Sequence, residues 1–311
     1  MEKNKVKNKK YTLSDFLGGY FENIGKMTIV NMLFCIPLAF YIGIMFLLNC
    51  FGINNIFVLL LAIPFLSPFS AGLFYVSRKI TMDEELKPVK DFIKGIKENV
   101  LYFLINSVIV YIVTAGLFIT FSFYVTGLSD SMMTASFVMT VFFTIFFLFF
   151  ENSLLSMIVT VDLKLGDIIK NSVLLVLKGL GGHIKTILSF AFLFMIIYSL
   201  FMFTRNIYFI AVFMSVIILL FLPIMCSYII VFNSYKTLKR HIIEPFIEEQ
   251  NKQNKISEDT NLVEEELYAA DIEKLEALSK GDENEFVFLN GKMIKRKAII
   301  NMLDKYKSEE E

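Results

Sequence analysis

Residues 145–155 read IFFLFFENSLL, and this stretch decides which class of fold the chain adopts. Six large apolar side chains in succession stand directly before a carboxylate, Glu151. A helix at the surface of a soluble protein keeps one face polar, so a run that is apolar on every face indicates a lipid environment. The composition agrees, because 56% of the 311 residues are hydrophobic and the mean hydropathy is +0.62. The sequence therefore predicts an all-α membrane protein.

Six segments are long and apolar enough to cross a hydrocarbon core of roughly 30 Å as helices. They are residues 27–48, 55–77, 99–126, 132–160, 184–204 and 207–234. Prolines within three of these segments predict kinks, above all in the second, which contains both Pro64 and Pro68. We expect a polytopic protein with six transmembrane helices.

Positive charge is distributed unevenly among the connections between these segments. On one side, 19 Lys and Arg fall in residues 1–26, 78–98, 161–185 and 235–240, whereas the opposite connections hold Arg205 alone. The positive-inside rule therefore predicts that both termini are cytoplasmic. The expected division is a basic arm with an interfacial helix (1–26), a transmembrane domain (27–238) and an acidic cytoplasmic tail (239–311).

Two of the basic connections contain amphipathic segments. Residues 88–98, PVKDFIKGIKE, place apolar side chains at helical spacing behind a proline suited to a first helical position. Residues 166–178 are more apolar and too short to span easily. The first segment is predicted to lie along the membrane surface and the second to be an interfacial or partly inserted helix. The shared D-[FI]-I-K pattern at Asp91 and Asp167 hints at a duplicated unit.

The strongest candidate for an intramembrane polar site is a stripe on the fourth span. At 100° per residue, Ser136, Thr140, Thr144 and Glu151 fall within about 80° of one another. A charge in lipid is costly, so Glu151 should face protein or water. Two interpretations stay open, helix–helix packing or a path for a substrate, ion or proton. The possible cationic partners of Glu151 are Arg78 and Lys185.

Other polar residues favour structural roles. Asn31 and Asn106 lie within spans, where interhelical hydrogen bonding is the ordinary use of an amide. The two histidines, His183 and His241, stand near predicted helix ends without a metal-ligand set, so we expect them to be interfacial or solvated. The run GLGGHIKT at 179–186 lacks the glycine that precedes lysine in a phosphate loop, and predicts a helix break.

No catalytic, redox or cofactor signature is present in the sequence. The three cysteines, Cys35, Cys50 and Cys226, have no zinc-site spacing and indicate no disulfide framework. The overall charge is zero and gives no support to nucleic-acid binding. We therefore expect a protein that is not an enzyme and carries no cofactor or metal.

The tail is acidic, with 18 Asp and Glu against 10 Lys and Arg in residues 241–311. Asn261 and Glu264 could cap a helix that runs to about Ser279. Asn290-Gly291 between apolar residues predicts a short β-hairpin. A small partner-binding module and a disordered tail with weak local structure are both open interpretations.

Four stretches carry a resemblance to a known family. They are FLGGYFENIGKMTIVNMLFCIPLAF (16–40), PFSAGLFYVSRKI (68–80), PVKDFIKGIKENV (88–100) and VDLKLGDIIKNSVLLVLKGLGGHIKTIL (161–188). Over residues 11–240 the chain resembles the YesL-like bacterial integral membrane proteins, a family of unknown function. The resemblance implies the bacterial cytoplasmic membrane. It also implies an accessory role near sugar ABC transporters, because genes of the family often lie beside those for carbohydrate uptake.

Two functions are expected from these observations. The first is a non-enzymatic accessory or interaction partner of a carbohydrate-uptake system, with ABC transporter subunits or another membrane protein as partners besides the lipid bilayer. The alternative is a secondary transporter or channel for a small solute or ion that uses the carboxylate of Glu151.

Overall fold

The structure is a computed structural model in which two compact units are separated at residue 241. It describes residues 11–53, 55–127, 131–203, 206–245, 272–283, 285–289 and 292–309. Several sequence predictions lie outside these residues, namely those on the first ten residues, Arg205, Asn261, Glu264 and Asn290-Gly291. The first unit holds the apolar helices, and the second holds the C-terminal tail.

Five helical spans among the described residues are long and apolar enough to cross a membrane. They comprise α1 (Leu13–Cys50), α2 with α3 (Ile56–Leu60 and Ala62–Thr81), α4 (Pro88–Gly127), α5 (Ser131–Thr160) and α7 (Leu180–Phe203). A bent pair, α8 (Ile207–Leu220) and α9 (Leu222–Leu238), supplies a sixth if it counts as one span. The prediction of an all-α, multi-pass membrane protein is confirmed.

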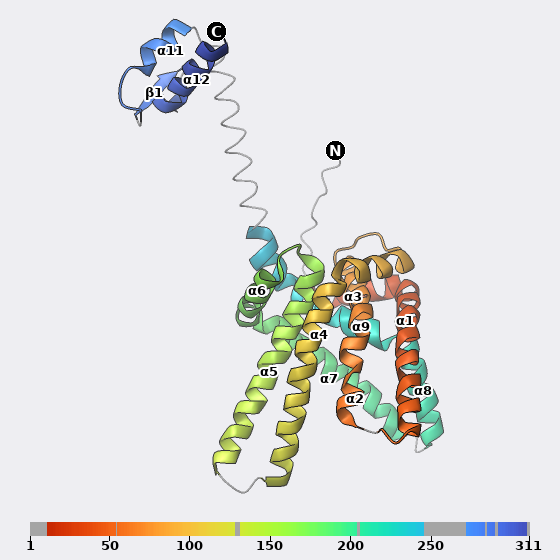
Figure 1. The fold of residues 1–311 in the computed structure, drawn as a ribbon. Coiled ribbons are helices and arrows are strands. Elements are labelled where there is room, and N and C mark those ends of the chain that lie inside the picture. The colour runs from red at the N-terminus through yellow and green to blue at the C-terminus, as the bar shows by residue number, and fades with distance from the viewer. Residues whose placement is uncertain are drawn as a thin grey trace. The chain divides into compact units, whose positions relative to one another are not determined.

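The first unit is a helical bundle with two distinct ends (Figure 1). The start of α1, the α3–α4 and α5–α6 connections and the end of α9 lie at one end, which is also where most lysines fall. The short helix α6 (Leu165–Lys178) packs beside the last turns of α5 at this end, and a π-helical turn, η1 (Lys239–Ile243), follows α9. The bundle thus gathers its positive charge on one side.

Two of the predicted surface segments are continuous with spans. Helix α1 runs for 38 residues from a capping box in which Thr12 N donates to Asp15 Oδ2 at 2.8 Å. Helix α4 runs for 40 residues and begins at Pro88. Since a span needs only about 20 residues, both helices extend well past the hydrocarbon core at the lysine-rich end.

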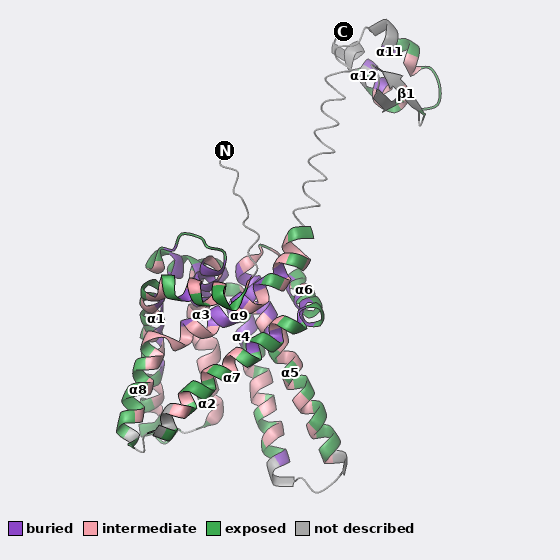
Figure 2. Ribbon diagram, turned by 180° about the vertical axis from the view of Figure 1, so that it is seen from behind, coloured by how far each residue is buried: buried purple, intermediate pink, exposed green. Residues whose placement is uncertain are grey.

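The tightest packing is near the lysine-rich end, where Figure 2 shows the buried residues concentrated. The hydrophobic core there unites α1, α3, α9 and the first turns of α4, with members that include Met27, Val76 and Tyr228. Glycine permits the close contact between α3 and α4, because a Cβ on Gly72 would stand 2.8 Å from the carbonyl oxygen of Phe92. The opposite half of the bundle exposes apolar side chains, as lipid contact requires.

Prolines break the second and sixth spans. A proline cannot donate to the carbonyl four residues earlier, and the helices end at Leu60 before Pro64 and at Leu220 before Pro223. At the first break, Tyr41 of α1 supplies a hydrogen-bond donor, since its hydroxyl lies 2.9 Å from the carbonyl oxygens of both Val58 and Leu59. The helix is thus interrupted before Pro64, whereas α3 continues through Pro68, and the two pieces together form one span, Ile56–Thr81.

The break between α8 and α9 bends the span by 50° and is filled by Asn31. Its Nδ2 donates to the carbonyl oxygens of Ile218 and Leu219 at 2.7 Å each. Its Oδ1 accepts from the backbone N–H of Ile224 at 2.9 Å. A fully buried side-chain amide thus substitutes for the backbone hydrogen bonds lost at the break.

The second unit, Ile242–Glu311, contains α11 (Ile272–Ser279), the antiparallel strands β1 (Phe286–Leu289) and β2 (Lys292–Lys295), and α12 (Arg296–Glu309). Its buried side chains include Leu275, Ile299 and Leu303, which join α11 to α12. Two helices and a paired hairpin therefore pack on one small core of their own.

Candidate functional site

Glu151 lies in the second half of the α5 helix, nine residues before its end, and is enclosed by protein. Only 8% of the residue is exposed, and Asn106 of α4 donates from Nδ2 to Glu151 Oε2 at 2.9 Å. A buried polar group in a membrane protein is stabilised by such interhelical hydrogen bonds. The carboxylate thus faces the neighbouring helix, which is one of the two environments, protein or water, that the sequence left open.

The second carboxylate oxygen of Glu151 is buried and has no hydrogen-bond partner among the residues that the structure describes. A carboxylate can accept several hydrogen bonds, and an unmet acceptor in a dry environment is unfavourable. Glu151 is therefore only partly satisfied by Asn106. This group is the natural place to look for intramembrane chemistry.

The hydroxyls of the stripe are used within their own helix. Thr140 donates to the carbonyl oxygen of Ser136 at 2.9 Å, and Thr144 donates to that of Thr140 at 2.8 Å. Tyr124 of α4 also lies 3.4 Å from Thr140 Oγ1. The stripe therefore contacts α4 at two levels, at Thr140 and at Glu151, and forms part of the seam between α4 and α5.

Neither of the two cations expected near Glu151 forms an ion pair with it. Arg78 donates to the carbonyl oxygen of Val159 at 3.2 Å and pairs with Glu84 at 3.3 Å. Val159 is roughly 12 Å further along α5 than Glu151, so Arg78 reaches the end of the helix instead. Lys185 is exposed. The predicted charge partners are replaced by an amide, because the α4–α5 register brings Asn106 to Glu151.

His183 was expected at an interface or in solvent, and the structure places it in the protein interior. Only 3% of it is exposed, and its Nε2 lies 3.2 Å from Ser153 Oγ. The imidazole stacks on Phe149 with ring centroids 4.7 Å apart. Phe149 and Ser153 lie roughly opposite Glu151 on the α5 wheel, so α5 presents one polar contact to α4 and another to α7.

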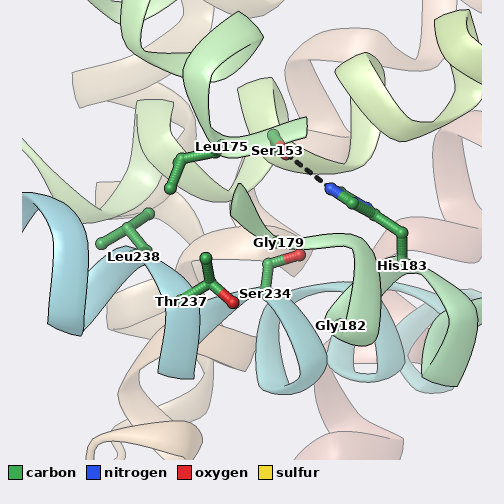
Figure 3. Close-up of a pocket in the computed structure, with 8 residues that line it drawn as sticks. All are labelled: Ser153, Leu175, Gly179, Gly182, His183, Ser234, Thr237 and Leu238. Carbon is green, nitrogen blue, oxygen red and sulfur yellow. Dashed lines mark hydrogen bonds between the residues drawn. The ribbon is translucent and has the colours of Figure 1, made fainter. Parts of the chain in front are cut away.

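A small pocket adjoins His183 where α5, α6, α7 and α9 meet (Figure 3). Its lining residues are Ser153, Leu175, Gly179, Gly182, His183, Ser234, Thr237 and Leu238. The space has room for about one water molecule. Such a cavity can hold an ordered water between hydroxyls, but it is too small for a sugar.

The glycines of the 179–186 run have a packing role. Gly179 ends α6 and separates it from α7, which is the helix break that the sequence predicts. A Cβ on Gly182 would stand 2.8 Å from the carbonyl oxygen of Asn233 in α9. Both glycines therefore bring the start of α7 close to α9. In a phosphate loop the backbone N–H groups would instead have to be open to a ligand.

The described residues hold no cluster of three or more His, Cys, Asp or Glu side chains that could bind a metal. Cys35, Cys50 and Cys226 are free thiols. The position of His183 was missed because a lone histidine at a predicted helix end gives no sign of burial. The one sequence feature that indicated burial of His183 was the pair of apolar segments on both sides of Gly179–Thr186.

Comparison with family models, curated proteins and solved structures found no match to this chain. The resemblance to the YesL-like proteins thus stays a prediction from residues 11–240. The functional argument rests on the chain's own geometry.

Proposed function

We propose that the protein is a non-enzymatic accessory protein of the membrane, which binds a partner through its C-terminal unit. The observation that carries this proposal is that residues 242–311 form a compact unit with helices and a hairpin of their own. A tail with no role beyond following the last span would not need a hydrophobic core of its own. A small folded unit tethered to a membrane bundle is well suited to recruiting another protein.

Charge supports a cytoplasmic position for this unit. The connections at one end of the bundle carry almost all the lysines and arginines between spans, and the chain leaves α9 at that same end. The partner we propose is a subunit of a carbohydrate ABC transporter in the bacterial cytoplasmic membrane. This choice rests on the YesL-like resemblance of residues 16–40 and 88–100.

Copurification tests the proposal. The full chain and a chain that ends after residue 241 are each expressed with an N-terminal tag and purified from native membranes in mild detergent. We expect transporter subunits with the full chain and not with the shortened one. Recovery of the same subunits with both chains would place the contact in the bundle, and recovery of no transporter subunit with the full chain would refute the proposal.

A second candidate function is the movement of a small solute or ion through the bundle. The specific observation in its favour is that Oε1 of Glu151 has no hydrogen-bond partner among the described residues, in a bundle with one broken and bent span. In this account Glu151→Gln abolishes flux in reconstituted vesicles while the protein stays folded. Flux that is unchanged in Glu151→Gln removes Glu151 from any transport path.

A further inference from the structure

The short helix α6 presents three different faces around its axis. Its buried face consists of Ile168, Ser172, Leu175 and Val176, which pack against the bundle. Within this face Ser172 Oγ donates to the carbonyl oxygen of Ile168 at 2.7 Å and lies 3.4 Å from Met157 Sδ of α5. The packing of the buried face against the bundle fixes the rotation of α6 about its own axis and so decides where its other residues point.

The second face is apolar and exposed. With Ile169 set at zero, Val173 falls at about 40° and Leu177 at about 80° on the helical wheel. Leu177 is 66% exposed, and the other two are more than a third exposed. At 14 residues, roughly 21 Å, α6 is too short to cross a bilayer. An apolar face of this kind fits a helix that lies in the membrane plane.

The third face carries positive charge. Lys170 falls at about 100° and Lys178 at about 180°, with Asp167 between them at about 160° and Lys164 at the helix start. The exposed apolar side chain of Leu174 falls within the same arc, at about 140°. The three lysines are exposed and form no ion pair within the described part of the chain. On α3 and α4, by contrast, Lys79 pairs with Asp91 and Lys94 with Glu98. With three lysines against the single carboxylate of Asp167, this face of α6 keeps a net positive charge.

We propose that α6 is an in-plane membrane helix that binds anionic phospholipid headgroups through Lys170 and Lys178. The apolar face sets the depth of α6 in the leaflet, because Ile169, Val173 and Leu177 contact acyl chains. The lysine face, next to it on the wheel, then stands at the level of the phosphates. Each lysine near an anionic surface contributes about 1 kcal/mol of attraction. The ligand is thus a negatively charged lipid of the leaflet that contacts the lysine-rich end.

The chain contains no tryptophan, so one introduced indole reports its own depth. Leu177→Trp places the indole on the exposed apolar face, and Asp167→Trp places it on the lysine face. The purified full chain is reconstituted in vesicles of phosphatidylcholine and phosphatidylglycerol with bromine on the acyl chains. We expect strong quenching of Leu177→Trp and weak quenching of Asp167→Trp. No quenching of Leu177→Trp would mean that protein, such as a second copy, covers this face, and would overturn the proposal.

The choice of lipid is tested with the same indole at position 177. Brominated phosphatidylglycerol and brominated phosphatidylcholine are compared at equal mole fraction, and we expect a preference of about fivefold for the anionic lipid. Adding Lys170→Gln and Lys178→Gln should bring the ratio close to one. Adding Lys94→Gln and Lys97→Gln on α4 instead should leave it unchanged. Equal quenching by both lipids, or a preference that survives the α6 substitutions, would contradict headgroup binding by these lysines.

Discussion

Asn31 in α1 donates a hydrogen bond of 2.7 Å to the carbonyl oxygen of Leu219, the oxygen that Pro223 leaves without its helical donor. The same amide accepts from the backbone N–H of Ile224. The broken sixth span is therefore completed by a side chain from the first span. This arrangement ties the two ends of the first unit's sequence together inside the membrane.

Asn31→Leu should lower the free energy of unfolding by about 2 kcal/mol, because it leaves buried backbone groups without partners. Thermal or denaturant unfolding of the purified protein in detergent measures this. Asn23→Ala is the matched control on the same helix, since Asn23 Nδ2 bonds only to the carbonyl oxygen of Gly19 in its own helix.

The break itself supplies a second test of Asn31. Pro223→Ala restores a backbone donor for Leu219, so Asn31→Leu should cost less stability in that background than in the native one. A double-mutant cycle gives the coupling between the two positions. Costs that add without coupling would show that Asn31 does not act through the break.

Glu151→Gln should change stability by less than about 0.5 kcal/mol, because a glutamine oxygen still accepts from Asn106. Asn106→Leu should cost about 2 kcal/mol, since it leaves the carboxylate buried without its donor. The double variant with leucine at both positions should regain most of that loss. If Asn106→Leu is as stable as the native protein, the hydrogen bond between α4 and α5 is not a stabilising contact.

Gly182→Ala should destabilise the bundle by about 2 kcal/mol, because its Cβ would stand 2.8 Å from the backbone of Asn233. Gly181→Ala is the matched control, since a Cβ there has nothing within 4 Å. As alanine is the better helix former, the control should be neutral or slightly stabilising. Equal effects at the two positions would contradict the close packing of α7 on α9.

In the second unit, Arg296 holds the loop that follows α11. Its guanidinium donates to the carbonyl oxygen of Leu278 at 3.0 Å and to Glu285 Oε2 at 2.7 Å. Arg296→Ala should weaken this unit by about 2 kcal/mol, seen as faster hydrogen exchange in residues 272–309 of the full chain. Lys297→Ala, at an exposed side chain, should leave the exchange unchanged. Unaltered exchange in Arg296→Ala would show that the loop holds without it.

The spans and their breaks could be predicted from the sequence, since hydropathy and proline act locally. The breaks fall just before Pro64 and Pro223, although α1 and α3 continue through Pro37 and Pro68. Glu151 avoids lipid because a charge in lipid is so unfavourable. Both features depend on one segment and its solvent. They needed no knowledge of the neighbouring helix.

The partners of the polar residues could not be predicted in the same way. Asn106 meets Glu151 because of the register between two antiparallel helices, and Arg78 reaches Val159 because of where α3 ends against α5. Likewise, His183 is buried only because Gly179 and Gly182 let α7 approach α9. These are properties of packing between segments far apart in the sequence.

Partner recovery with the Arg296→Ala and Lys297→Ala chains tests the central claim most directly. The quantity measured is the molar ratio of ABC transporter subunit to tagged protein after purification from native membranes. The account predicts the full ratio with Lys297→Ala and with Glu151→Gln, and a reduced ratio with Arg296→Ala. A full ratio with Arg296→Ala together with a loss in Glu151→Gln would place function in the membrane bundle and contradict the account.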